Sequence, residues 1–121
     1  MSKFVKVKTE LRDLRMIKQS LEDLKLDYSE NAMWKHFFGG FSGKVDLVVK
    51  TPAVSFGLRK NEQELYEVLA DDMQMKSIKV TLQKVQQRYA YHKVVEETAK
   101  AGFELVEEKV GADKVIRLTV R

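Results

Sequence analysis

The sequence has no cysteine and only one proline, Pro52, among its 121 residues. The lack of cysteine excludes disulfide bonds, thiolate metal sites and cysteine nucleophiles. No apolar run approaches the roughly 20 residues that a membrane-spanning helix needs. The N-terminal segment alternates lysine with apolar residues, whereas a signal peptide needs a continuous apolar stretch. We therefore expect a protein without a membrane anchor, in the cytoplasm or an equivalent organellar compartment.

The composition predicts one folded domain over residues 1–121, because 44% of the residues are hydrophobic and 33% are charged. No Pro-, Gly- or Ser-rich linker divides the chain. The formal net charge is +4 and unevenly placed: residues 1–60 hold 12 Lys/Arg against 7 Asp/Glu, and residues 61–121 hold 10 against 11. This excess is compatible with an acidic partner such as nucleic acid, although many ordinary proteins have a similar charge.

Two amphipathic helices are predicted from apolar residues at steps of three and four. The first covers residues 10–24, and Thr9 is expected to cap its start. The second covers residues 77–101, with Ser77 as its N-cap and Gly102 as a left-handed C-terminal cap. The apolar stripe of the second helix is Ile78, Leu82, Val85, Tyr89, His92, Val95 and Ala99.

Strands are predicted where apolar and polar residues alternate. They cover residues 3–9, 44–51, 54–58, 64–69, 103–110 and 114–120, and a short strand near Tyr28 is left open. Val45, Leu47 and Val49 are expected to share one face of the 44–51 strand. Antiparallel strands interleaved with two helices predict an α+β fold, with both helices packed on one face of an antiparallel sheet, as a relative of the ferredoxin-like fold.

Residues that carry catalysis or hold a metal are not recognisable in the sequence. His36 and His92 lack the spacing of metal ligands, and Gly39-Gly40 lacks the lysine of a phosphate-binding loop. The adjacent carboxylates Asp71-Asp72 point to opposite sides if they lie on a strand, so they suit solvent better than shared acid/base work. We expect no catalytic residue, no metal site and no cofactor.

His92 is the most informative polar residue, because it falls on the apolar stripe of the second helix. It is either a buried histidine held by hydrogen bonds or a group that senses pH or contacts a ligand. An enzyme built on Arg88, Tyr91 and His92 is a further alternative, but Tyr91 and His92 point about 100° apart around a helix. They can converge only at the edge of a pocket.

An aromatic cluster occupies the glycine-flanked segment before the 44–51 strand. Its candidate partner-binding residues are Trp34, Phe37, Phe38 and Phe41. Such rings form either a corner of the core or an exposed docking surface, since aromatic side chains dominate protein interfaces. The two alternatives are distinguished by whether the rings are buried or exposed.

A basic sheet face is the basis of a second functional hypothesis. Lys6 and Lys8 alternate with core-facing valines, and their side is shared with other cations if the strands are neighbours. The candidate nucleic-acid residues are Lys6, Lys8, Lys50, Arg117 and Arg121. RNA-binding sheets of this architecture add stacking aromatic residues, and here only Phe4 is clearly placed for that role.

Several segments resemble a known family. They are Phe4-x-x-x-Lys8-Thr9, Gln87 to His92, Gly102-Phe103, Val106-Glu107-Glu108 and Ile116 to Val120. This pattern is similar to the uncharacterised cyanobacterial and plastid family named for hypothetical chloroplast reading frame thirty-five, which has relatives in other bacteria and in phages. The family motif falls on Arg88, Tyr89, Tyr91 and His92, whereas the aromatic segment departs from the family pattern.

The resemblance implies a small α+β protein with no established activity, in the cytoplasm or the plastid stroma. It also implies an adaptor role, because some bacterial relatives are encoded beside AAA-type ATPases. We therefore expect a non-enzymatic protein-binding adaptor or accessory subunit. The alternative is an RNA- or DNA-binding protein that uses the basic sheet face.

Overall fold

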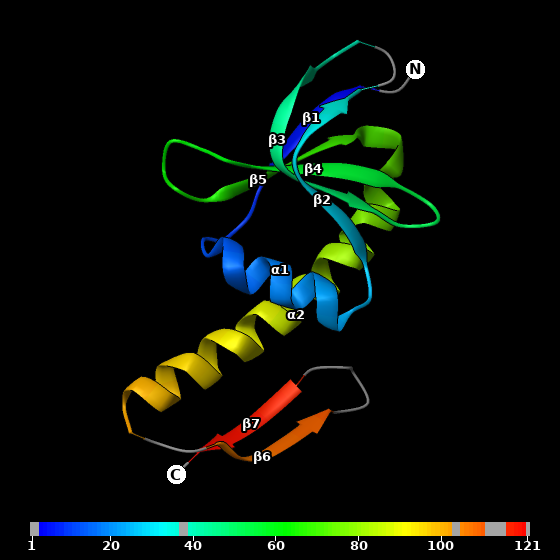
Figure 1. Ribbon diagram of the computed structural model, residues 1–121. Helices are drawn as coiled ribbons and strands as arrows, with labels where there is room; N and C mark the ends of the chain where they lie inside the picture. Colours follow the sequence, from blue (N-terminus) through cyan, green and yellow to red (C-terminus); the bar gives the residue numbers. More distant parts are fainter. Residues whose placement is uncertain (1–2, 37–38, 103–104, 111–115, 121) are drawn as a thin grey trace.

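The computed structural model describes residues 3–36, 39–102, 105–110 and 116–120, with side chains up to residue 102 (Figure 1). Five strands form one antiparallel sheet in the order β1-β5-β4-β3-β2. The elements in chain order are β1 (Phe4–Lys8), α1 (Leu14–Asp23), β2 (Asp27–Lys35), β3 (Ser42–Lys50), β4 (Ser55–Lys60), β5 (Tyr66–Asp71), a 3₁₀ turn (Asp72–Gln74), α2 (Met75–Lys100), β6 (Leu105–Val110) and β7 (Ile116–Val120).

The predicted α+β class, with both helices on one face of an antiparallel sheet, is confirmed (Figure 1). The ferredoxin-like detail is not confirmed. Strands β2 to β5 pair with their neighbours in sequence as a meander, and β1 is added beside β5 at the edge. Strands β6 and β7 form a separate two-stranded sheet, and β7 contacts α2.

The main core lies between the two helices and the sheet. Ile17 and Leu21 of α1, Ile78 of α2 and Phe56 of β4 have no exposed surface. Residues three or four apart on a helix share one face, and so do residues two apart on a strand. These side chains therefore point into the same layer. Each fully buried side chain of this size contributes about 1.5–3 kcal/mol, so the core accounts for much of the stability.

The first helix begins at Leu14, later than predicted, and Thr9 does not cap it. The Thr9 hydroxyl instead donates to the Tyr66 carbonyl oxygen at 2.6 Å, which extends the pairing of β1 with β5 beyond the strand. Asp13 is the N-cap, and its side chain accepts from the backbone N–H groups of Arg15 and Met16. The carboxylate therefore satisfies two of the orphan donors in the first turn.

The second helix begins at Met75, so Ser77 lies inside it and is not its N-cap. Gly102 has φ +82°, which confirms the left-handed residue after the helix end. No residue of α2 after Tyr89 is buried, and the predicted apolar stripe therefore leaves the core before His92. No helix in the described part of the chain has both the length and the apolar character needed to cross a membrane.

The sheet is strongly curved, and its two edge strands meet at one end (Figure 1). The rings of Phe4 on β1 and Trp34 on β2 lie 6.1 Å apart, although three strands separate β1 from β2 in the sheet order. A second apolar cluster forms where they meet, on the face away from the helices. Its buried members are Trp34, Val45, Val48 and Leu69, with Phe4, Ala32 and Phe41 partly buried around them.

The prediction that Val45 shares a face with Leu47 and Val49 is wrong. Leu47 and Val49 belong to the main core, whereas Val45 packs in the second cluster. The facing strand has Asn31 in the left-handed conformation, with φ +48°, between the pairs Glu30–Leu47 and Ala32–Val45. Asn tolerates this conformation, and the side-chain alternation changes phase there.

Candidate functional site

The candidate site lies on the face of the sheet that points away from α1 and α2, which we call the open face. Val5 and Val7 pack against the main core, so Lys6 and Lys8 point to the opposite side of β1. The register places Lys8 opposite Glu67 of β5, and Glu67 opposite Arg59 of β4. Side chains of three adjacent strands therefore meet in one row.

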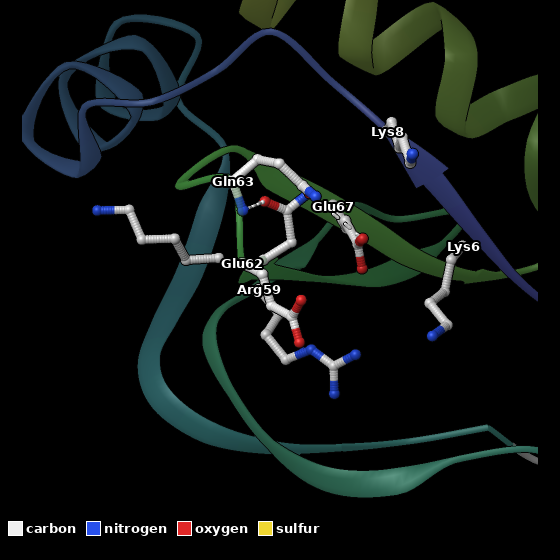
Figure 2. A pocket seen from close by; sticks show the side chains of 8 residues that line it. Lys6, Lys8, Arg59, Glu62, Gln63 and Glu67 are labelled. Carbon is white, nitrogen blue, oxygen red and sulfur yellow. Dashed lines mark hydrogen bonds between the residues drawn. The ribbon is translucent and has the colours of Figure 1, made fainter.

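These residues surround a shallow depression of about 540 Å³ (Figure 2). Its lining is Lys6, Lys8, Arg59, Lys60, Asn61, Glu62, Gln63 and Glu67. In Figure 2 the side chains of Lys6 and Arg59 extend to the same side of the sheet as the Glu67 carboxylate. The depression is therefore polar and dominated by long cationic side chains.

Three of the cations form no ion pair with a described residue, although Glu67 lies opposite Lys8 and Arg59 in the strand register. Within the part of the chain that the structure describes, Lys6, Lys8 and Arg59 form no ion pair, whereas Arg15 and Lys18 do. The Arg59 guanidinium instead lies over the Phe41 ring, 5.2 Å from its centre. Unpaired cations on one surface attract an anionic ligand.

Lys60 lines the depression, but its ammonium group lies apart from the other three cations. Its ammonium lies 5.8 Å from the centre of the Tyr66 ring, and Tyr66 is buried in the main core. Neighbouring residues of a strand face opposite sides, so Lys60 and Arg59 diverge. The cationic set of the site is therefore Lys6, Lys8 and Arg59.

The turn between β4 and β5 forms one wall of the depression and is fixed by Asn61. The Asn61 side-chain oxygen accepts from the backbone N–H of Gln63 at 2.9 Å and of Leu65 at 3.1 Å. Its amide nitrogen donates to Glu67 Oε1 at 3.4 Å. This Asx-type turn holds the wall and keeps the Glu67 carboxylate engaged beside the cations.

The sequence missed Arg59 because the predicted strand ended at Leu58, which placed Arg59 in the turn. Strand β4 in fact continues to Lys60. The sequence could have shown that Arg59 faces away from the core. Phe56 and Leu58 belong to the core, so Gly57 and Arg59 lie on the opposite side of the strand.

Only part of the predicted basic face lies on the large sheet. Lys50 follows Val48 in alternation on β3 and lies on the same face as Lys6 and Lys8. The placement of Arg117 on this face is wrong, because β7 pairs with β6 and is not hydrogen-bonded to the large sheet. Arg121 lies outside the described residues.

Of the two alternatives for the aromatic cluster, Trp34 fits the core, because its side chain is only 6% exposed. Gly57 on β4 lies beside the indole, and a Cβ there would be 3.5 Å from Trp34 Cγ, which is an ordinary contact. Phe41 is half-buried and stacks on Phe4, with ring centres 5.4 Å apart. Phe37 and Phe38 lie outside the described residues.

The family-motif residues gather at the contact between α1 and α2. Asp23 at the end of α1 accepts from Arg88 through Nε at 3.2 Å and Nη2 at 3.0 Å. His92 Nε2 lies 2.6 Å from the same carboxylate oxygen. The Arg88 guanidinium also lies over the Tyr91 ring, 4.4 Å from its centre. His92 is 20% exposed, so it is hydrogen-bonded at the edge of the helix contact and is not a core histidine.

Partial burial of Asp23 opposes its ionisation, but its hydrogen bonds from His92 and Arg88 outweigh that effect and lower the pKa of the carboxyl. Tyr89, the remaining motif residue, is buried, and its hydroxyl accepts from the backbone N–H groups of Arg12 and Asp13. The motif thus joins the two helices, and the polar groups of Arg88, Tyr89 and His92 make contacts within the chain.

The chain is similar to proteins of a known family. The model of a family described as "Protein of unknown function (DUF1257)" matches residues 20–119. The chain is 34% identical to "Uncharacterized protein ycf35" of Pyropia yezoensis and 32% identical to the protein of the same name from Guillardia theta. Each alignment covers 100% of this chain and 97% of the relative. No solved structure matches the chain.

Proposed function

Because this chain belongs to the DUF1257 family, whose description assigns no activity, we propose from the site geometry that it binds nucleic acid through the open face of its sheet. The observation that carries the proposal is the convergence of Lys6, Lys8 and Arg59, none of them ion-paired within the described residues. We also propose that it acts in the cytoplasm or the plastid stroma.

The proposed contact is with the phosphate backbone. The Phe4 and Phe41 rings stack on each other, and Arg59 lies over Phe41, so these rings are not free platforms for bases. Phosphate contacts give affinity without reading sequence. With three such contacts, the logarithm of the association constant should fall linearly with the logarithm of the salt concentration. The expected slope is about −2.1 for a single strand and −2.7 for a duplex.

The test is fluorescence anisotropy with a labelled single-stranded RNA and a duplex DNA of mixed sequence. Affinity for the single strand is expected to fall about 20-fold between about 50 and 200 mM salt. The triple variant Lys6→Glu/Lys8→Glu/Arg59→Glu should lose binding at all salt concentrations. Its matched control is Lys76→Glu/Lys79→Glu/Lys84→Glu, which changes three exposed lysines of α2 by the same charge.

Two results would contradict the proposal. One is no binding by the unmodified protein at low salt. The other is an equal loss of affinity in both triple variants, since that would show a response to net charge without a defined site. Circular dichroism of each variant confirms that the fold is retained.

A non-enzymatic adaptor function is the second candidate, and exposed methionines favour it. Met33 is 65% exposed and Met73 is 74% exposed, although methionine is an apolar residue enriched at protein interfaces. An AAA-type ATPase is the proposed partner. Co-purification with such an ATPase from the same organism, lost in Met33→Ser/Met73→Ser but retained in the triple lysine–arginine variant, would favour this function over nucleic-acid binding.

A further inference from the structure

A second depression, of about 290 Å³, lies on the same open face of the sheet. Its lining is Met33, Trp34, Lys35, His36, Val48, Lys50, Ser55, Asp71 and Gln74. Glu67 lines the basic depression and Asp71 lines the second, four residues further along β5. At the rise of a strand, these positions are about 13 Å apart.

The floor of this pocket is apolar and fixed. Trp34 and Val48 are buried members of the second apolar cluster, and His36 is only 2% exposed. Trp34 and His36 lie with ring centres 6.4 Å apart. The His36 Nδ1 accepts from the backbone N–H of Gly40 at 3.3 Å. A planar group placed on this floor would contact the small exposed parts of Trp34 and Val48, which packing holds in place.

The wall of the pocket is polar. Ser55 and Gln74 each supply both hydrogen-bond donors and acceptors. Asp71 is held in place, because its Oδ1 accepts from the Met73 backbone N–H at 3.0 Å and its Oδ2 lies 3.7 Å from His36 Nε2. These groups can form hydrogen bonds with both the donors and the acceptors along the edge of a heterocyclic ring.

The rim of the pocket is cationic. Lys35 and Lys50 are exposed, and neither forms an ion pair within the described residues. Asp71 is the only carboxylate among the lining residues, and it is engaged with His36 and the following turn. The rim therefore favours an anionic substituent on whatever ring occupies the floor.

We propose that this pocket binds one nucleotide unit, with the base on the Trp34–Val48 floor and the phosphate at Lys35 and Lys50. The volume is at the small end of the range for ligand pockets, which suits one unit and excludes a longer segment. The unit comes either from a free mononucleotide or from the phosphorylated end of a strand. The second source rests on the proposed function, because that strand would continue over Lys6, Lys8 and Arg59.

Trp34 is the only tryptophan of the chain, so its fluorescence reports directly on the pocket. The test titrates the protein with each of the four 5′-ribonucleoside monophosphates, with excitation beyond their absorption. A saturable change in Trp34 emission is expected, with affinity weakened at least about 10-fold in Lys50→Glu. The matched control is Lys44→Glu, an exposed lysine of the same strand that does not line the pocket.

The absence of a saturable change at about 10 mM nucleotide would overturn the proposal, as would equal affinities of Lys50→Glu and Lys44→Glu. Binding in Lys6→Glu/Lys8→Glu/Arg59→Glu supports the pocket even if that variant no longer binds RNA. RNA binding without mononucleotide binding overturns the pocket and leaves the proposed function intact. Competition by a 5′-phosphorylated oligonucleotide, but not by its 5′-hydroxyl form, identifies the strand end as a source.

Discussion

Gly40 lies against Phe4 so closely that a Cβ at position 40 would be 2.4 Å from the Phe4 Cβ. Gly40 precedes β3, and Phe4 begins β1 at the other side of the sheet order. The contact therefore brings the β2–β3 hairpin onto the opposite edge strand and curves the sheet. The two depressions of the open face lie on either side of this closure, which is lined by Phe4, Trp34 and Phe41.

The first prediction concerns this closure. Gly40→Ala should reduce the free energy of unfolding by about 1–3 kcal/mol, because the methyl group meets a Cβ that cannot rotate away. Gly57→Ala is the control: its Cβ would lie 3.4–3.5 Å from Val45 and Trp34, an ordinary contact, and should cost less than about 1 kcal/mol. Urea unfolding followed by Trp34 fluorescence measures both. Equal costs would show that the Phe4 contact does not constrain the fold.

The second prediction concerns the hydroxyl of Tyr89. Tyr89→Phe leaves the backbone N–H groups of Arg12 and Asp13 without this acceptor at the start of α1. The expected loss is about 1–3 kcal/mol of unfolding free energy. Val94→Ala, at a 38% exposed position of the same helix, should change stability by less than about 0.5 kcal/mol. An unchanged urea midpoint in Tyr89→Phe would mean that water replaces the hydroxyl without cost.

The third prediction concerns the pH dependence of the α1–α2 contact. Hydrogen bonds from His92 and Arg88 outweigh the opposing effect of burial, so the folded-state pKa of Asp23 is below its unfolded value. A lowered pKa stabilises the fold above the unfolded pKa of about 3.9, and this stability is lost as pH falls through the folded pKa. Asp23 is 35% exposed, so solvent screens the effect.

Asp23→Asn should therefore cost about 1 kcal/mol at pH 7, and the difference from the unmodified protein should shrink below about pH 4. Urea unfolding at a series of pH values measures it. Asp27→Asn is the control, because Asp27 is exposed and its carboxylate has no hydrogen bond within the described residues. A difference that persists unchanged to pH 3 would show that ionisation of Asp23 is not its cause.

The fourth prediction concerns Glu67, the carboxylate in the row of cations. Glu67→Gln keeps the oxygen that accepts from Asn61 and removes one negative charge beside Lys8 and Arg59. Affinity for single-stranded RNA should rise about two-fold at low salt. A unit charge about 10 Å from a bound phosphate changes the binding free energy by only tenths of a kcal/mol in water. Glu97→Gln, at an exposed position of α2, should leave affinity unchanged. Weaker binding by Glu67→Gln would argue against a phosphate ligand at this site.

Sequence patterning predicted the elements that depend on near neighbours. Alternation located β1 and the β4–β5 hairpin, and the three-to-four spacing located both helices. The helix boundaries were predicted less accurately, because a side chain with the chemistry of a cap can bond to another partner instead. Thr9 had the chemistry of a cap, but its hydroxyl bonds to Tyr66, 57 residues away, and Asp13 takes the role.

The candidate site was predicted only in part for the same reason. Lys6 and Lys8 were placed on the open face by their alternation with core valines, a local property. Arg59 joins them only because β5 pairs with both β1 and β4, and Arg117 does not because β7 pairs elsewhere. The burial of Trp34 depends on its packing with Val45, Val48 and Leu69 of other strands.

The sequence alone thus determined the α+β class, the positions of the helices and the basic character of one strand face, because each follows from repeats of two to four residues. The tertiary structure decided which strands are neighbours, which aromatic rings are buried and which cations share a surface. Those features depend on contacts between residues far apart in the chain, and no local period encodes them.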